Sequence, residues 1–247
     1  MAGHSKWKQI KHKKAKTDAQ RSKVYTKVIR EITIASRNGG SDPAGNPRLR
    51  LAIQTAKENN MPSDTIQRAV KKGAGELEGQ ALEEFWYEGY GPAGVALIID
   101  VVSDNRHRTA GEVRHALTKH NGSLGENGSV SWNFETRGVI TIDKKHADEE
   151  TMMAAALDAG ASDVSDEGDV YEVYTDPTEL FQVVEALKKA NLPAVSSEIL
   201  KVPKTYVTLS GDDARKVLTL VEALEDLDDV QRVSANFDIP DEILQQG

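Results

Sequence analysis

The spacing of apolar residues between Asp18 and Asn38 predicts a long amphipathic helix that ends at the Gly39–Gly40 pair. One face of this helix carries most of the apolar residues: Val24, Tyr25, Val28, Ile29 and Ile32. The opposite face gathers Lys23, Lys27, Arg30 and Arg37, together with Lys16 if the helical period extends back to it. Ile34 is the exception, because it falls on the basic side.

Two shorter helices are predicted next. The first has Asn46 as its N-cap and Pro47 in its first turn, and the second begins near Ser63 or Asp64 and ends at Gly73. Their apolar faces contain Leu49, Ala52, Ile53 and Ala56 in one helix and Ile66, Ala69 and Val70 in the other. Because the three apolar faces have only each other to pack against, we expect a helical domain over residues 1–78, with a flexible N-terminal tail and an outward basic face.

From about Phe85 the pattern changes to strands that alternate with helices. The expected strands are 95–102, 129–134, 139–142, 161–164, 170–174, 197–200, 206–209 and 230–237, and the expected helices are 109–120, 148–159, 177–190 and 212–224. This order predicts an α+β protein, in which the three-helix domain precedes two ferredoxin-like βαββαβ domains. One of these domains, 135–203, is inserted in the other, which comprises 79–134 and 204–238. The half that starts at strand 206–209 is expected to pair with the half at 95–134.

Charge divides the chain sharply. The first 75 residues contain 17 of the 31 lysines and arginines and five of the 39 acids, a balance of +12. The remaining residues carry −20, which the overall net charge of −8 conceals. A basic N-terminal region (the basic head) on an otherwise acidic protein (the acidic body) is typical of proteins that bind nucleic-acid phosphates. This interpretation is favoured over the alternative, that the basic region is a solvated tail that keeps the protein soluble.

The densest basic segment is Met1–Lys16. Its candidate contacts are the phosphate-binding side chains and one aromatic ring that can stack on a base: Lys6, Trp7, Lys8, Lys11, His12, Lys13, Lys14 and Lys16. The candidates on the first helix are Arg21, Lys23, Lys27, Arg30 and Arg37.

Arg106 and Arg108 stand at the start of the helix that Asp104 or Asn105 is expected to cap. A cation at this position is repelled by the partial positive charge of the helix N-terminus, and a bound phosphate would offset this repulsion. Alternatively, Arg108 pairs with Glu112 and Arg106 pairs with Asp104. The sequence leaves both readings open.

Several function classes find no support. The absence of cysteine excludes disulfides and thiolate chemistry, and the six histidines have no metal-ligand spacing. Gly89–Gly94 matches GxGxxG, but a strand follows it, so a tight turn is expected. Glu225–Asp229 is expected to be a solvated helix end. We expect no catalytic residue, metal or cofactor, no membrane contact, a cytoplasmic location and a monomer.

Eight motifs in order along the chain closely resemble the YebC family: MAGHSKW, IKHKKAKTDAQR, SKVYTKVIREI, NPRLRLAI, NNMP, YEGYGPAGVA, SDNRHRT and GSVSWNF. That family comprises bacterial proteins described as probable transcriptional regulators and the mitochondrial translational activator of cytochrome oxidase. The resemblance implies a helical N-terminal domain and two α/β domains, the last inserted in the middle one. Two departures, Tyr25 where Phe is common and His107 where Asn is common, leave the charge unchanged.

The resemblance implies a non-catalytic nucleic-acid-binding regulator and leaves its target open, because family members are linked both to DNA and to the ribosome. The basic residues of the head are mostly lysines, which suit phosphates better than bidentate base recognition. The residues of the head therefore favour RNA. Among the functions that the resemblance implies, this favours a partner of ribosomal RNA and the ribosome that relieves stalling at proline-rich stretches. The alternatives are a DNA-binding transcriptional regulator and a protein-interaction adaptor.

Overall fold

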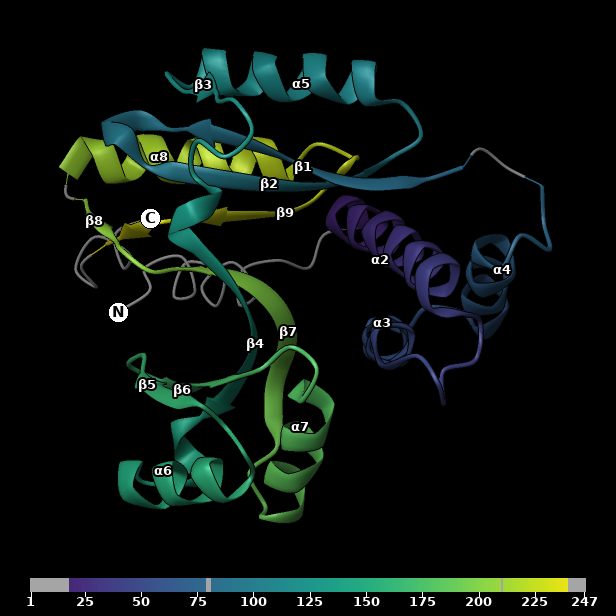
Figure 1. Ribbon diagram of the computed structural model, residues 1–247, viewed down its shortest axis with the longest axis vertical. Helices are drawn as coiled ribbons and strands as arrows, with labels where there is room; N and C mark the ends of the chain where they lie inside the picture. Colours follow the sequence, from purple (N-terminus) through teal and green to yellow (C-terminus); the bar gives the residue numbers. More distant parts are fainter. Residues whose placement is uncertain (1–17, 79–80, 210, 240–247) are drawn as a thin grey trace. The chain divides into compact units, whose positions relative to one another are not determined.

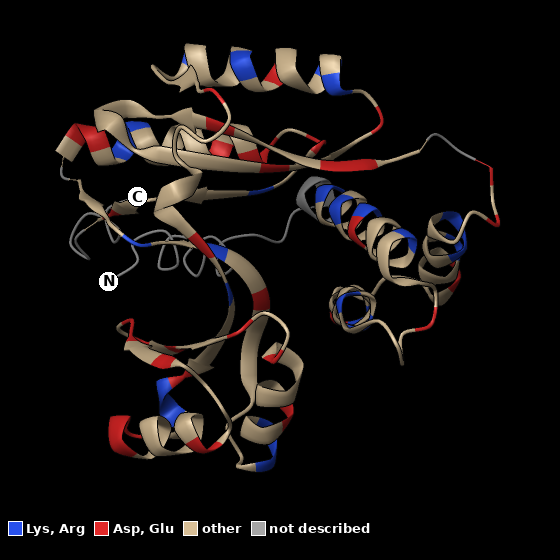
Figure 2. Ribbon diagram, in the orientation of Figure 1, with Lys and Arg blue, Asp and Glu red and all other residues tan. Residues whose placement is uncertain are grey.

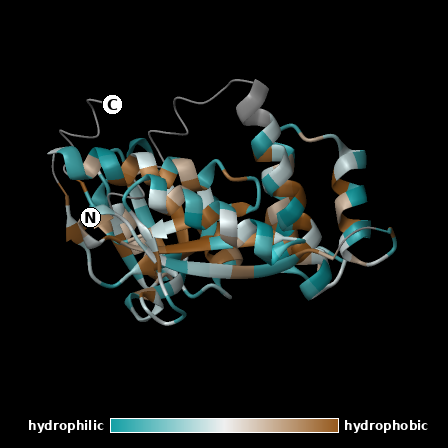
Figure 3. Cartoon of the chain, turned by 90° about the horizontal axis from the view of Figure 1, so that it is seen from above, coloured by the Kyte–Doolittle hydropathy of each residue, from teal (hydrophilic) through white to brown (hydrophobic). Residues whose placement is uncertain are grey.

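The computed structural model describes residues 18–78, 81–209 and 211–239, and it combines helices with mainly antiparallel sheets (Figure 1). Residue contacts divide the described chain into two compact units: residues 18–130 with 211–233, and residues 131–209 with 234–239. Hydrophobic residues concentrate on the strands and alternate with hydrophilic ones along the helices (Figure 3). The predicted α+β class, with helices first and sheets after them, is confirmed.

The first unit begins with α2 (Asp18–Gly39), α3 (Pro47–Glu58) and α4 (Ser63–Gly73). Asn46 caps α3 as predicted, because its side-chain oxygen accepts a hydrogen bond from the Leu49 amide at 3.0 Å. Its Nδ2 also donates to the carbonyl oxygens of Ala35 and Gly40, at 2.7 and 2.8 Å. The apolar faces pack together, with a core of Ile32, Ala35, Leu49, Ala52, Ala56, Met61, Ile66 and Ala69.

The same unit contains a four-stranded sheet in the order β3-β1-β2-β9. Its strands are β1 (Glu83–Tyr90), β2 (Ala96–Ser103), β3 (Ser123–Leu124) and β9 (Val230–Ala235). Helices α5 (Arg106–Lys119) and α8 (Gly211–Glu225) contact one another. The Gly89–Gly94 segment includes the last two residues of β1 and then the expected tight turn, in which η1 (Pro92–Gly94) joins β1 to β2.

This sheet has a ferredoxin-like strand arrangement, but two of the predicted strands do not belong to it. The strand after α5 is Ser123–Leu124, whereas Ser131–Asn133 is a 3-10 turn (η2), so the expected strand at 129–134 is wrong. The expected strand at 206–209 shortens to β8 (Val207–Thr208), which pairs in parallel with β10 (Phe237–Asp238). β1 occupies the sheet position that had been expected for 206–209, so one strand of the ferredoxin-like arrangement comes from an earlier part of the chain than predicted.

The second unit contains a complete βαββαβ motif: β4 (Phe134–Asp143), α6 (Glu149–Asp158), β5 (Asp163–Asp166), β6 (Val170–Thr175), α7 (Leu180–Lys189) and β7 (Ala194–Pro203). The order β5-β6-β4-β7, antiparallel throughout, is the ferredoxin-like order predicted for the inserted segment. Helix α7 packs on β4 and β7 (Figure 1).

Gly138 lies in β4 where α7 crosses it, and no side chain fits there. A Cβ atom would lie 2.3 Å from Thr175 Oγ1 and 3.1 Å from Leu180 Cβ. We therefore expect Gly138→Ala to lower the free energy of unfolding by about 1–3 kcal/mol, measured by urea denaturation of the full chain. Gly111→Ala in α5 is the matched control, because a Cβ there meets nothing within 4 Å, and it should be neutral or stabilising. Equal effects of the two substitutions would contradict the steric argument.

Candidate nucleic-acid interface

The densest part of the predicted interface, in the N-terminal segment, lies outside the described residues: Lys6, Trp7, Lys8, Lys11, His12, Lys13, Lys14 and Lys16. Arg21 lies within α2, and its side chain is also outside the description. The role of these residues therefore stays a prediction.

The cations of α2 face an acidic turn of the same unit, Glu225–Asp229, between α8 and β9. Lys23 Nζ lies 3.0 Å from Asp226 Oδ1, and Lys27 Nζ donates to the carbonyl oxygen of Glu225 at 2.8 Å. Arg30 pairs with Asp229 at 2.8 Å and donates to the carbonyl oxygen of Asp228.

The basic face of α2 therefore points outward only in part: Lys23 and Arg37 are exposed, whereas Lys27 and Arg30 are half-buried in this contact. Ile34, the apolar exception on that face, is only 1% exposed, whereas Val24 on the apolar side is 38% exposed. At the end of the helix, Arg37 donates to the carbonyl oxygen of Leu82 at 2.5 Å. These contacts give the basic side of α2 a structural role.

Asp229 is the centre of this contact and is only 2% exposed, so it is not the solvated helix end expected from the sequence. Its Oδ2 accepts hydrogen bonds from Ser103 Oγ at 2.8 Å, Thr109 Oγ1 at 2.6 Å and Arg108 Nη2 at 2.7 Å. Burial by itself raises the pKa of the Asp229 carboxyl. The hydrogen bonds from Thr109, Arg108 and Ser103 and the charge of Arg30 outweigh burial, so the pKa lies below its ordinary value.

Both arginines at the start of α5 are paired, but with other partners than expected. Arg108 bonds Asp104 at 3.0 Å as well as Asp229, and these bonds raise the pKa of its guanidinium. Arg106 pairs with Glu83 at 2.7 Å and lies 4.3 Å above the ring centre of Phe85.

The helix cap at this position is Asn105, whose side chain accepts from the Arg108 amide at 3.0 Å. The charge of Arg108 near the helix start is therefore balanced by two carboxylates, and a phosphate is not needed to explain it. The expected pairing of Arg108 with Glu112 and of Arg106 with Asp104 is not what the structure shows.

A different set of cations is exposed on α4, and the sequence analysis did not single it out. Arg68, Lys71 and Lys72 follow one another at positions i, i+3 and i+4, so they share one side of the helix. All three are exposed, and none makes an ion pair or side-chain hydrogen bond with another described residue. Figure 2 shows the basic positions of α4 among those of the helical domain. Helical spacing alone would have found this basic face.

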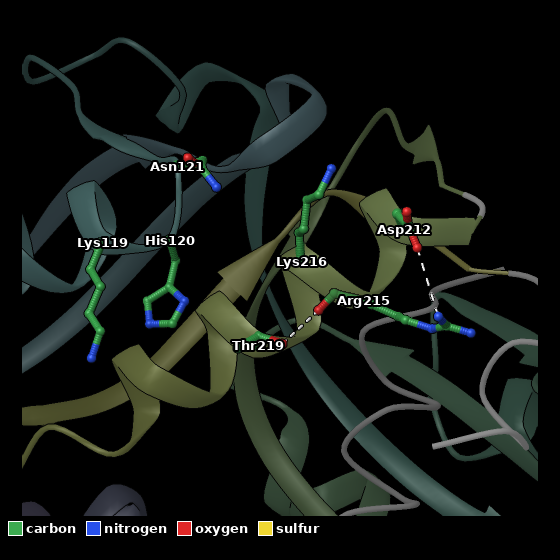
Figure 4. Close-up of a pocket in the computed structure, with 7 residues that line it drawn as sticks. All are labelled: Lys119, His120, Asn121, Asp212, Arg215, Lys216 and Thr219. Carbon is green, nitrogen blue, oxygen red and sulfur yellow. Dashed lines mark hydrogen bonds and ion pairs between the residues drawn. The ribbon is translucent and has the colours of Figure 1, made fainter.

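One shallow pocket, of about 280 Å³, lies between the end of α5 and the start of α8. It is lined by Lys119, His120, Asn121, Asp212, Arg215, Lys216 and Thr219 (Figure 4). Its cations do not converge: Lys119 and Lys216 point apart, and Arg215 turns toward Asp212, 3.8 Å away. Lys216 pairs with Asp213 at 3.2 Å. The pocket offers no set of donors aimed at one ligand.

No cluster of three or more His, Asp or Glu side chains suited to a metal ion occurs within the described ranges. No helix among the described residues is long and apolar enough to cross a membrane.

Comparison with known proteins decides the family. The model of the TACO1/YebC protein N-terminal domain matches residues 5–76, and that of the TACO1/YebC second and third domain matches residues 82–237. The chain belongs to the TACO1/YebC family. The resemblance noted in the sequence motifs is thereby confirmed.

Relatives within the TACO1/YebC family match over the full length. A probable transcriptional regulatory protein of Geobacter sulfurreducens is 54% identical to this chain, and the match covers 99% of that protein. A probable transcriptional regulatory protein of Halothermothrix orenii is 53% identical, and the match covers 98% of it. Both matches cover 100% of this chain. The crystal structure of a conserved hypothetical protein from Aquifex aeolicus superposes with a TM-score of 0.86 at 51% identity, covering 94% of this chain and 96% of that one. The TACO1/YebC relatives are thus named as regulatory proteins, which agrees with a non-enzymatic role.

Proposed function

We propose that this TACO1/YebC-family protein is a non-catalytic regulator of gene expression that binds nucleic acid through its basic head. The division of charge carries the proposal: residues 1–75 have a balance of +12, and the rest of the chain has −20. An acidic body repels a polyanion, so binding depends on the head, and it should weaken steeply with salt as counterions are exchanged.

The exposed part of the head that the structure describes adds a second argument. Arg68, Lys71 and Lys72 project from α4 with no acidic partner among the described residues. Holding three like charges on one helical face is unfavourable unless they meet an anion. The proposed interface therefore combines the lysine-rich segment before α2 with this face of α4.

RNA is the proposed target, and the ribosome is the proposed place of action, where the protein relieves stalling at proline-rich stretches. Two features support this choice over DNA: the head is rich in lysines, which act as point charges on phosphates, and it offers Trp7 and His12 for stacking on unpaired bases. The names of the relatives favour the alternative, a DNA-binding transcriptional regulator.

Sedimentation separates these two functions. We expect the full-length protein to migrate with ribosomes in a sucrose gradient, and Lys13→Glu with Lys14→Glu to release it, because reversal of two charges removes phosphate contacts. Crosslinking should recover ribosomal RNA from the ribosomal fractions. Absence from every ribosomal fraction, with crosslinks confined to promoter DNA, would replace the translational proposal by the transcriptional one.

A further inference from the structure

The contact between α2 and the acidic turn Glu225–Asp229 has two parts that differ in burial. In the inner part, the side chains of Arg30 and Asp229 are 19% and 3% exposed. In the outer part, the side chains of Lys23 and Asp226 are 44% and 60% exposed. Lys27 lies between the two on the same helical face and donates to the carbonyl oxygen of Glu225.

The two parts differ in how readily another anion can displace the acidic group that binds the cation of α2. An exposed ion pair contributes little net stability, because water and salt already screen both charges. Asp229 is held in place by Ser103, Thr109 and Arg108, and opening the inner part would leave the largely buried guanidinium of Arg30 without its carboxylate. The outer part is therefore exchangeable, and the inner part is not.

The oxygen atoms of the acidic turn resemble those of nucleic acid, the ligand proposed for the basic head. It presents a carboxylate to Lys23 and a carbonyl oxygen to Lys27, two cations one helical turn apart. A nucleic-acid strand presents phosphate oxygens in the same way, with the added gain of counterion release. A phosphate that approaches Lys23 is repelled by the carboxylate of Asp226, so the two ligands compete for these cations.

We propose that the acidic turn is an internal competitor for a phosphate-binding surface on α2. Nucleic acid binds Lys23 and Lys27 by displacing Asp226 and the carbonyl oxygen of Glu225, while the Arg30–Asp229 pair stays closed and anchors the turn. This inference rests on the proposed function, and it makes the turn an autoinhibitory contact that lowers affinity for weakly charged ligands.

Asp226→Asn tests the competition in the full-length protein. It should tighten binding of a fluorescent ribosomal RNA fragment about two- to fivefold at low salt, because this factor corresponds to the free energy of one exposed ion pair. The gain should shrink as salt rises, because salt screens that pair in the wild type. Glu222→Gln is the matched control: it removes the same charge one turn earlier on α8, from an exposed side chain that makes no ion pair with a described residue.

A double-mutant cycle separates competition from a general change in charge. In a Lys23→Met background, Asp226→Asn should gain no more than Glu222→Gln, because the cation released by the first change is gone. Equal gains of Asp226→Asn and Glu222→Gln in the wild type, or a gain of Asp226→Asn that persists beside Lys23→Met, would overturn the inference and leave the proposed function standing. A wild-type protein that binds no nucleic acid would overturn both.

Discussion

Asp229→Ala is expected to lower the free energy of unfolding by about 3–5 kcal/mol, the largest loss that we predict for a single substitution. The change leaves Arg30 and Arg108 without their shared carboxylate, and it takes the acceptor from the hydroxyls of Ser103 and Thr109. Urea denaturation of the full-length protein measures the loss. Asp228→Ala is the control, because Asp228 is exposed and only its carbonyl oxygen contacts Arg30. Similar losses for both variants would rule out a special role of the buried carboxylate.

The carboxylate of Asp229 also makes the free energy of unfolding decrease as the pH falls. The pKa of Asp229 is lower in the folded protein than in the unfolded chain, so the unfolded chain takes up a proton first as the pH falls. This contribution to stability is complete above the unfolded pKa, about 3.9, and is lost as the pH falls through the folded value. The free energy of unfolding of Asp229→Ala should therefore fall less steeply at acidic pH than that of the wild type.

Lys71→Glu combined with Lys72→Glu is expected to weaken binding of ribosomal RNA by about tenfold or more near 0.15 M salt. Each lost phosphate contact removes about 0.7–0.9 from the slope of log affinity against log salt concentration, so two contacts give a slope change of roughly 1.5. Fluorescence anisotropy over a salt series measures both quantities.

Lys188→Glu combined with Lys189→Glu is the matched control for this pair. Both pairs are adjacent exposed lysines in the last turn of a helix, and both changes alter the net charge equally. The control should weaken binding much less, because α7 belongs to the acidic body. An equal loss from both pairs would mean that net charge, and not the α4 surface, governs binding.

The features that depend on local sequence could be predicted well. Helix α3 begins where Asn46 and Pro47 indicate, since a cap bond spans only three residues. The order of elements in the inserted motif also follows the chain, because each of its strands and helices has its own hydrophobic period.

The features that depend on distant pairing could not be predicted. Nothing local tells β1, rather than 206–209, to pair with both β2 and β3, and β3 has only two residues. The same limit applies to the interface. Periodicity placed Lys23, Lys27 and Arg30 on one face of α2, but their partners lie about 200 positions further along the chain. A basic face on a helix is equally suited to a ligand and to an acidic turn of its own chain.

The separation of Lys27 from Glu225, 198 positions, has a consequence during biosynthesis. At roughly 5–20 residues per second, about 10–40 s pass between the synthesis of α2 and that of its acidic turn. Strand β9, which borders β2, emerges later still. Every nascent copy therefore presents the cations of α2 to the translating ribosome before their internal partner has been made.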